Sequence, residues 1–182
     1  TVSGGSIFIS AGTLTVNGTY DSSSAGKITF FADAGSYKTD LTGVEARDFQ
    51  LIGSPQSEEA LRALLAAAAD ACFVNPILSD TSIALSDDLT IPGNVRISMY
   101  SGAILTVSAG KTLTIEKRAN AIHYNNGLEL WGNARLDIEA DAQLINNGSL
   151  DCSLSLEENS KLHIKTGAAL INNASMYVWS PA

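Results

Sequence analysis

Short runs in the second half of the chain alternate apolar and polar residues with a period of two. This is the pattern of a β-strand that buries one face. No consistent two-residue turn separates the runs, so hairpins are not expected. The pattern predicts very short strands that point Leu, Ile and Val inward. These strands are Leu128–Leu130, Leu136–Ile138, Leu154–Leu156, Leu162–Ile164 and Met176–Val178.

A longer motif repeats within the same region. The sequence LINNGSL at 144–150 returns 26 residues later as LINNASM at 170–176, and a partial copy, YNNGL at 124–128, stands 21 residues before the copy at 144–150. Such a spacing is typical of one repeat of a solenoid rather than of a duplicated domain. If the repeats stack, each strand pairs in parallel with its equivalent about 4.8 Å away.

Pairs of asparagines mark each copy of the motif. A corner between strands needs a residue that accepts a left-handed backbone, and Asn does so at low cost. Stacked corners would also stack the Asn amides, which can donate to and accept from one another. We therefore predict a structural Asn ladder rather than a ligand site, made of Asn125, Asn126, Asn146, Asn147, Asn172 and Asn173.

With these corners, the chain resembles right-handed parallel β-helix proteins of the pectate-lyase-like class. The segments 59–64, 83–85, 88–91 and 110–115 also look like the opening of β-helix regions in secreted bacterial surface proteins. The resemblance covers roughly residues 57–178. It implies an all-β fold, a single-stranded right-handed parallel β-helix (β-solenoid), with the handedness that parallel crossovers favour.

One amphipathic helix is predicted from about Ser57 to Cys72. Ser54 or Ser57 can cap it, and Glu58 and Glu59 fall in the first turn, where carboxylates are favourable. Its apolar stripe must be buried, and the open end of a strand stack needs a cover, so we expect a capping helix. The stripe consists of Leu61, Leu64, Leu65, Ala68 and Cys72.

Two regions follow from this organisation. Residues 1–53 are predicted to form irregular β-rich coils, with a loop at about 32–48, and residues 54–182 the helix-capped β-helix. One continuous solenoid domain is the alternative. The expected strands of the first region are Ile7–Ile9, Thr13–Val16, Lys27–Phe30 and Phe49–Leu51.

Composition limits the classes of partner. The net charge is −8, and basic residues are not clustered enough to bind nucleic acid. The longest apolar run is too short to insert into a membrane. Cys72 and Cys152 are too few for a disulfide framework, and a buried free thiol is expected at Cys72. An acidic surface suits an extracellular or cell-surface location.

Outward strand positions carry the charged residues that could do chemistry. With the 26-residue offset, Asp137 should lie beside His163, and Glu139 beside Lys165, on neighbouring repeats. A polysaccharide lyase needs carboxylates for calcium and a basic residue for proton abstraction, but cross-strand pairing selects the same residues for stability. We favour the structural interpretation and predict no catalytic residues, no metal site and no cofactor.

Three aromatic residues form the candidate ligand site: Trp131, Tyr177 and Trp179. If Leu128–Leu130 stacks on Leu150–Cys152 and then on Met176–Val178, the two tryptophans hold equivalent positions two repeats apart. Aromatic faces two strand spacings apart, about 10 Å, suit the pyranose rings of a sugar chain. If Leu128–Leu130 stacks instead on Leu154–Leu156, Glu157 lies opposite Trp131 and the alignment is expected to be lost.

The sequence therefore favours a non-enzymatic secreted or cell-surface module of a bacterial protein, adhesive or carbohydrate-binding, with glycans or host or cell-surface polymers as partners. A β-helix polysaccharide lyase or hydrolase, or a fragment of one, is the first alternative. A structural spacer or self-assembling surface unit is the second, since open solenoid ends would allow oligomers.

Overall fold

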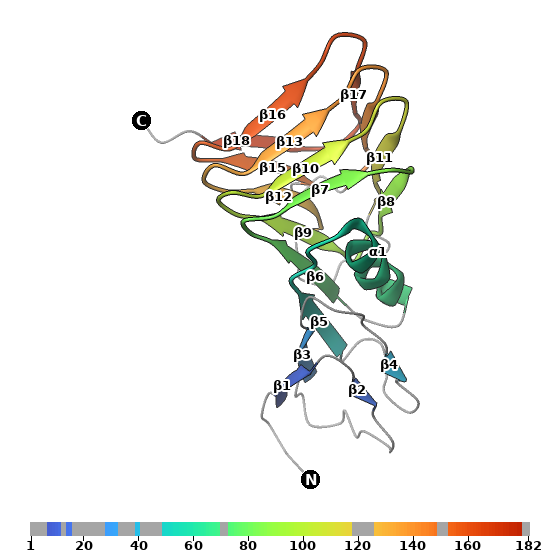
Figure 1. Cartoon of the computed structure of the whole chain (residues 1–182), viewed down its shortest axis with the longest axis vertical. Helices are drawn as coiled ribbons and strands as arrows, with labels where there is room; N and C mark the ends of the chain where they lie inside the picture. Colours follow the sequence, from blue (N-terminus) through green and yellow to red (C-terminus); the bar gives the residue numbers. More distant parts are fainter. Residues whose placement is uncertain are drawn as a thin grey trace.

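The computed structural model describes residues 7–11, 14–15, 28–32, 39–40, 49–69, 73–117, 126–148 and 153–179. Within them the protein is an all-β structure of parallel sheets with one short α-helix (Figure 1). An eight-stranded sheet runs the length of the structure, and two four-stranded sheets accompany its second half. The all-β, parallel character predicted from the sequence is confirmed.

The strands are short, as the two-residue period requires. One four-stranded sheet contains β7 (Ser82–Leu85), β10 (Ile104–Val107), β13 (Arg135–Ile138) and β16 (Lys161–Ile164). The other contains β8 (Leu89–Ile91), β11 (Thr112–Ile115), β14 (Gln143–Asn146) and β17 (Ala169–Asn172). The second half of the long sheet contains β6 (Phe73–Leu78), β9 (Arg96–Met99), β12 (Gly127–Leu130), β15 (Leu154–Glu157) and β18 (Met176–Trp179).

Consecutive strands enter the three sheets in turn. From β7 onward, each group of three strands places one strand in each sheet, and each strand pairs in parallel with the strand three places later. We call such a group a repeat, so that repeat 1 is β7–β9 and repeat 4 is β16–β18. Leu144 pairs with Leu170, as the 26-residue motif spacing predicts.

Inward columns of apolar side chains form the core. Leu85, Val107 and Ile138 are all fully buried at equivalent positions of β7, β10 and β13. All five strand runs predicted for the second half lie in observed strands. The structure adds β14 and β17, because the first residues of the Asn motif are themselves strand and only their end is a corner.

The N-terminal strands continue the long sheet below β6 (Figure 1). Its order begins β1-β3-β5-β6, so hydrogen-bonded pairing crosses residue 53 without a break. A small two-stranded sheet lies beside it, and its β4 falls in the segment predicted to be a loop. The strands are β1 (Ile7–Ala11), β2 (Leu14–Thr15), β3 (Ile28–Ala32), β4 (Thr39–Asp40) and β5 (Phe49–Gly53).

Helix α1 spans Glu58–Ala66 and continues as a 3₁₀ turn, η3 (Ala67–Ala69). The Ser57 hydroxyl accepts a hydrogen bond from the Ala60 amide at 3.2 Å, the N-cap geometry expected for serine. The predicted helix is therefore confirmed, with an α-helical part shorter than expected. Cys72 and Cys152 lie outside the described residues.

The apolar stripe of α1 is buried against the sheets. Leu61, Leu64 and Leu65 belong to the core. Leu64 packs so closely on β5 that a Cβ added to Gly53 would lie 2.7 Å from a Leu64 methyl carbon. The helix thus lies beside β6 and β7, at the end of the two four-stranded sheets where β7 and β8 are the last strands.

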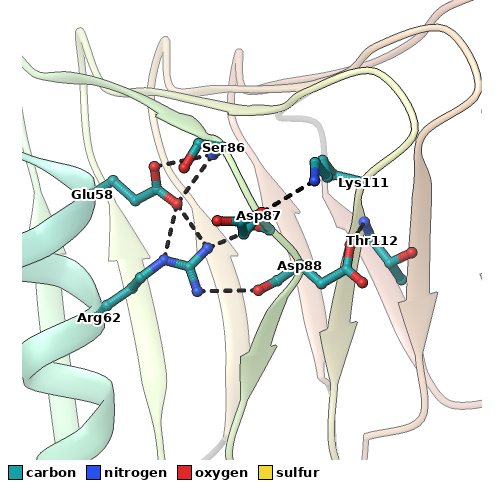
Figure 2. Close-up of polar contacts among 7 residues, drawn as sticks. All are labelled: Glu58, Arg62, Ser86, Asp87, Asp88, Lys111 and Thr112. Atoms are coloured by element: carbon teal, nitrogen blue, oxygen red, sulfur yellow. Dashed lines mark hydrogen bonds and ion pairs between the residues drawn. The ribbon is translucent and has the colours of Figure 1, made fainter.

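Polar side chains of α1 bond to the backbone just after β7 (Figure 2). The Glu58 carboxylate accepts hydrogen bonds from the Ser86 amide at 3.0 and 3.1 Å. Arg62 donates to the carbonyls of Asp87 and Asp88 at 2.8 and 3.0 Å, and to Glu58 at 2.7 Å. In this way α1 satisfies backbone groups at the edge of the stack that have no further strand to pair with.

These contacts also set the charge state of Glu58. Burial alone would raise its pKa, but hydrogen bonds from the Ser86 backbone and from Arg62 outweigh burial and hold the pKa below its ordinary value. The same loop is tied to repeat 2, because Asp87 pairs with Lys111 at 3.1 Å and Asp88 accepts from the Thr112 amide at 2.8 Å (Figure 2).

Two asparagine rungs connect repeats 3 and 4. Asn146 donates to Asn172 at 2.7 Å, and Asn173 donates to Asn147 at 2.8 Å. Asn146 is fully buried and also accepts from the Gly148 amide and the Ser153 hydroxyl, so its amide is well satisfied. These contacts are those of a structural side chain rather than of a ligand site.

The predicted extension of this ladder to Asn126 is wrong. The residue that pairs with Asn146 in repeat 2 is Ile115, the last residue of β11, whereas Asn126 stands directly before β12 in the long sheet. Asn126 donates to the Glu116 carbonyl at 3.0 Å instead. Asn125 lies outside the described residues.

Candidate binding surface

The register of the long sheet decides where the predicted aromatic residues lie. Leu128 pairs with Leu154, and Leu154 pairs with Met176. The first of the two stacking schemes, through Leu150–Cys152, is therefore wrong and the second is correct. The strand in repeat 3 begins at residue 154, after a corner longer than the one in repeat 4.

This register nevertheless keeps the two tryptophans aligned. Trp131 directly follows Leu130, which pairs with Leu156, and the next residue, Glu157, pairs with Trp179. The row Trp131, Glu157, Trp179 therefore crosses repeats 2, 3 and 4, with about 10 Å between the tryptophan backbones. The expectation that this scheme would destroy the alignment is wrong. The sequence offset from Leu154 to Met176 is shorter than the offset from Leu128 to Leu154, and this difference brings Trp179 into line with Trp131.

The row belongs to the outer side of the sheet. Glu157 accepts a hydrogen bond from the Ser155 hydroxyl at 2.9 Å, as neighbours on one face of a strand can. Tyr177 pairs with Ser155, so it stands beside Trp179 on that side. Tyr177 is 49% exposed and Trp179 45% exposed.

A third aromatic residue, not predicted from the sequence, lies in line with Trp131 and Trp179. The Tyr100 amide donates to Leu78 and the Trp131 amide donates to Met99, so both residues hold the same place after their strands. Tyr100 is 41% exposed. We call Tyr100, Trp131, Glu157 and Trp179 the aromatic row. The sequence does contain a signal for Tyr100, because Tyr100, Trp131 and Trp179 each come directly after an alternating strand run of the long sheet.

Carboxylates accompany the aromatic row. Glu129 lies 3.8 Å from Arg96, and it occupies the outward column that continues to Ser155 and Tyr177. The Glu158 carboxylate lies 3.7 Å from the Cβ position that Gly132 would have. Trp131 is partly buried, and its indole N–H is buried without a hydrogen-bond partner among the described residues. The surface combines exposed aromatic rings with an excess of carboxylates.

The outer face of β13 and β16 carries the other predicted residues. Lys165 contacts Glu139 at 2.6 and 2.7 Å, and Asp137 pairs with His163 in the strand register, which confirms both predicted pairs. Arg135 also donates to Asp137 at 2.9 Å. The His163 Nδ1 lies 3.2 Å from the Asp137 Oδ1, without the geometry of a hydrogen bond.

Both carboxylates on this face therefore have basic neighbours. Asp137 is buried and held by Arg135, and Glu139 is held by Lys165. An acid–base pair for glycan cleavage needs carboxyl groups free to face the scissile bond. The contacts of this face are those of cross-strand stabilisation.

Within the described parts of the chain, no three His, Cys, Asp or Glu side chains converge as ligands for a metal ion. In the same parts, no helix has both the length and the apolarity needed to span a bilayer. No protein-family model matches this chain, and neither a curated protein nor a solved structure matches it significantly.

Proposed function

We propose that this protein is a non-enzymatic, carbohydrate-binding module of a secreted or cell-surface protein, built as a right-handed parallel β-helix. The cycling of strands through three sheets and the parallel pairing of each with the strand three places later support the β-helix. The right-handed sense is the one that parallel crossovers favour.

The observation that carries the binding function is the aromatic row. It places Trp131 and Trp179 at equivalent positions two repeats apart, with the exposed Tyr177 alongside. Aromatic faces pack against the apolar faces of sugar rings, and a row across the strands presents them at a regular spacing to an extended polymer. Neighbouring carboxylates can accept hydrogen bonds from sugar hydroxyls.

Binding is tested on the full chain by calorimetry with soluble oligosaccharides of glucose, N-acetylglucosamine, glucosamine and galacturonic acid. Trp179→Ala and Tyr177→Ala should each weaken binding of any bound sugar by about tenfold, the loss of one stacking contact. Ile171→Ala is the matched control, because Ile171 is an equally exposed apolar side chain in a different sheet.

Intrinsic fluorescence locates the contact, since Trp131 and Trp179 are the only tryptophans. In Trp179→Phe, a sugar-dependent change in emission reports on Trp131 alone. If no oligosaccharide binds and emission never changes, the carbohydrate proposal is wrong and a spacer or assembly role takes its place.

A further inference from the structure

We infer that the aromatic row selects a polysaccharide that carries free amino groups, a polymer of glucosamine units in their ammonium form. The inference rests on the proposed function and names its ligand class. Its starting point is the third position of the row, where a carboxylate, Glu157, stands between two indole-bearing positions, Trp131 and Trp179. Each neighbour is one strand spacing away, about 4.8 Å.

Indoles flanking a carboxylate suit an ammonium group in two ways. The face of an indole attracts a cation, and tryptophan does so best of the aromatic side chains. The carboxylate adds charge pairing at the same point. A neutral sugar would use the indole faces but not the charge of Glu157.

Within the described residues, two carboxylates of this surface, Glu157 and Glu158, lack the ion pairs that the carboxylates on the outer face of β13 and β16 have. On the outer face of β13 and β16, Asp137 and Glu139 each contact a basic side chain. Near the aromatic row, Arg96 approaches Glu129 at 3.8 Å, whereas no described Lys or Arg forms an ion pair with Glu157 or Glu158. The row therefore has an excess of negative charge.

This excess discriminates between polymers. A uronate polymer would bring like charge against Glu157 and Glu158, and the net charge of −8 repels it at longer range. A polymer of glucosamine in its ammonium form is attracted by Glu157 and Glu158 and by the net negative charge. Because the row runs across the strands from Tyr100 to Trp179, over three strand spacings or about 14 Å, it matches an extended chain rather than a single sugar.

The test compares four hexamers on the full chain by calorimetry: glucosamine, N-acetylglucosamine, glucose with β-1,4 linkage, and galacturonic acid. The glucosamine hexamer should bind most tightly, and added salt should weaken its binding but not that of the acetylated hexamer. Glu157→Gln should weaken binding of the glucosamine hexamer by about three- to tenfold and leave the acetylated hexamer unchanged.

Glu116→Gln is the matched control. It makes the same charge change at an exposed residue directly after β11, which does not belong to the aromatic row. It should leave all affinities unchanged. Equal affinity for the acetylated and amino hexamers, or an unchanged Glu157→Gln variant, overturns the inference but keeps the proposed function. Failure of every hexamer to bind overturns both. Tighter binding of oligolysine than of oligoglucosamine would mean that the ligand is a basic peptide.

Discussion

The first and last of the four repeats differ in what covers their inward side chains. At the first end, α1 buries Leu61, Leu64 and Leu65 against the sheets, and Glu58 and Arg62 bond the backbone that follows β7. At the other end, the inward side chains of β16 and β18 have no described layer above them. Ile164 is 43% exposed and Val178 62% exposed.

The same inward column passes through both ends. Leu85, Val107 and Ile138 are fully buried, and Ile164 continues their column. The residue type hardly changes along it, yet burial disappears at the last strand. The burial of an inward side chain therefore requires a covering layer besides the alternation within its strand, and substitutions at the two ends should differ accordingly.

The largest difference should come from one substitution made at both ends. Leu64→Asp places a charge in the buried contact under α1 and should cost at least about 4 kcal/mol, enough to unfold a domain of ordinary stability. Val178→Asp at the open end should cost less than about 1 kcal/mol. Urea unfolding followed by circular dichroism measures both. A folded Leu64→Asp variant with an unchanged midpoint would refute the role of α1 as a cap.

The asparagine rungs should show a smaller difference of the same kind. Asn146→Ala leaves the Gly148 amide without an acceptor in the core and leaves the Ser153 hydroxyl with the Ser175 carbonyl alone, and should cost about 2 to 4 kcal/mol. Asn172→Ala removes a partner of Asn146 but leaves the bond from Asn146 to the Ser175 carbonyl, and should cost about 1 kcal/mol. Urea unfolding measures both variants. Equal losses of unfolding free energy would contradict the view that the buried Asn146 contributes more than the exposed Asn172.

At the closed end, Glu58 should make stability depend on pH. Because its folded pKa is lowered, its contribution is fully present above the ordinary carboxyl range and is lost as the pH falls through the lowered value. Glu58→Gln should cost about 1 kcal/mol at neutral pH, after allowance for partial exposure, and should flatten the acid limb of the stability curve. Unfolding midpoints from pH about 3 to 7 measure this dependence.

Glu59→Gln is the control for Glu58, since it makes the same charge change in the same helical turn at an exposed side chain. It should leave the shape of the pH curve as it is in the parent protein. If the two variants behave alike, the contacts with Ser86 and Arg62 do not stabilise the folded state.

The smallest effect is expected from the Glu139–Lys165 pair, which joins repeats 3 and 4 on the outer surface. A double-mutant cycle with Glu139→Gln and Lys165→Met should give a coupling of about 0.5 kcal/mol, decreasing with added salt. A coupling above about 2 kcal/mol would show that solvent screens the pair less than its exposure implies.

Much of the fold follows from local patterns in the sequence. The alternation in Leu136–Ile138 and Leu162–Ile164 predicted strands, and the 26-residue motif spacing predicted their register, which places Glu139 against Lys165. The Ser57 cap and the leucine stripe predicted α1. These features are local, or follow from one motif repeated at a single spacing, so short segments contain the information.

The sequence could not decide the path between repeats. A strand at Leu150–Cys152 and one at Leu154–Leu156 satisfy the same alternation, and only pairing with Leu128 on one side and Met176 on the other selects the second. The same pairing excludes Asn126 from the ladder. The place of Tyr100 beside Trp131 likewise depends on residues far apart in the sequence.

The sequence by itself therefore determined which residues point inward, where the helix begins and which strands of repeats 3 and 4 pair across the 26-residue offset. Tertiary structure alone decided the register across corners of unequal length, the bonding of Glu58 and Arg62 to the edge after β7, and the exposure of the last repeat. The physical reason is that alternation fixes the face of a side chain within its own strand, whereas register and burial depend on the neighbouring layer.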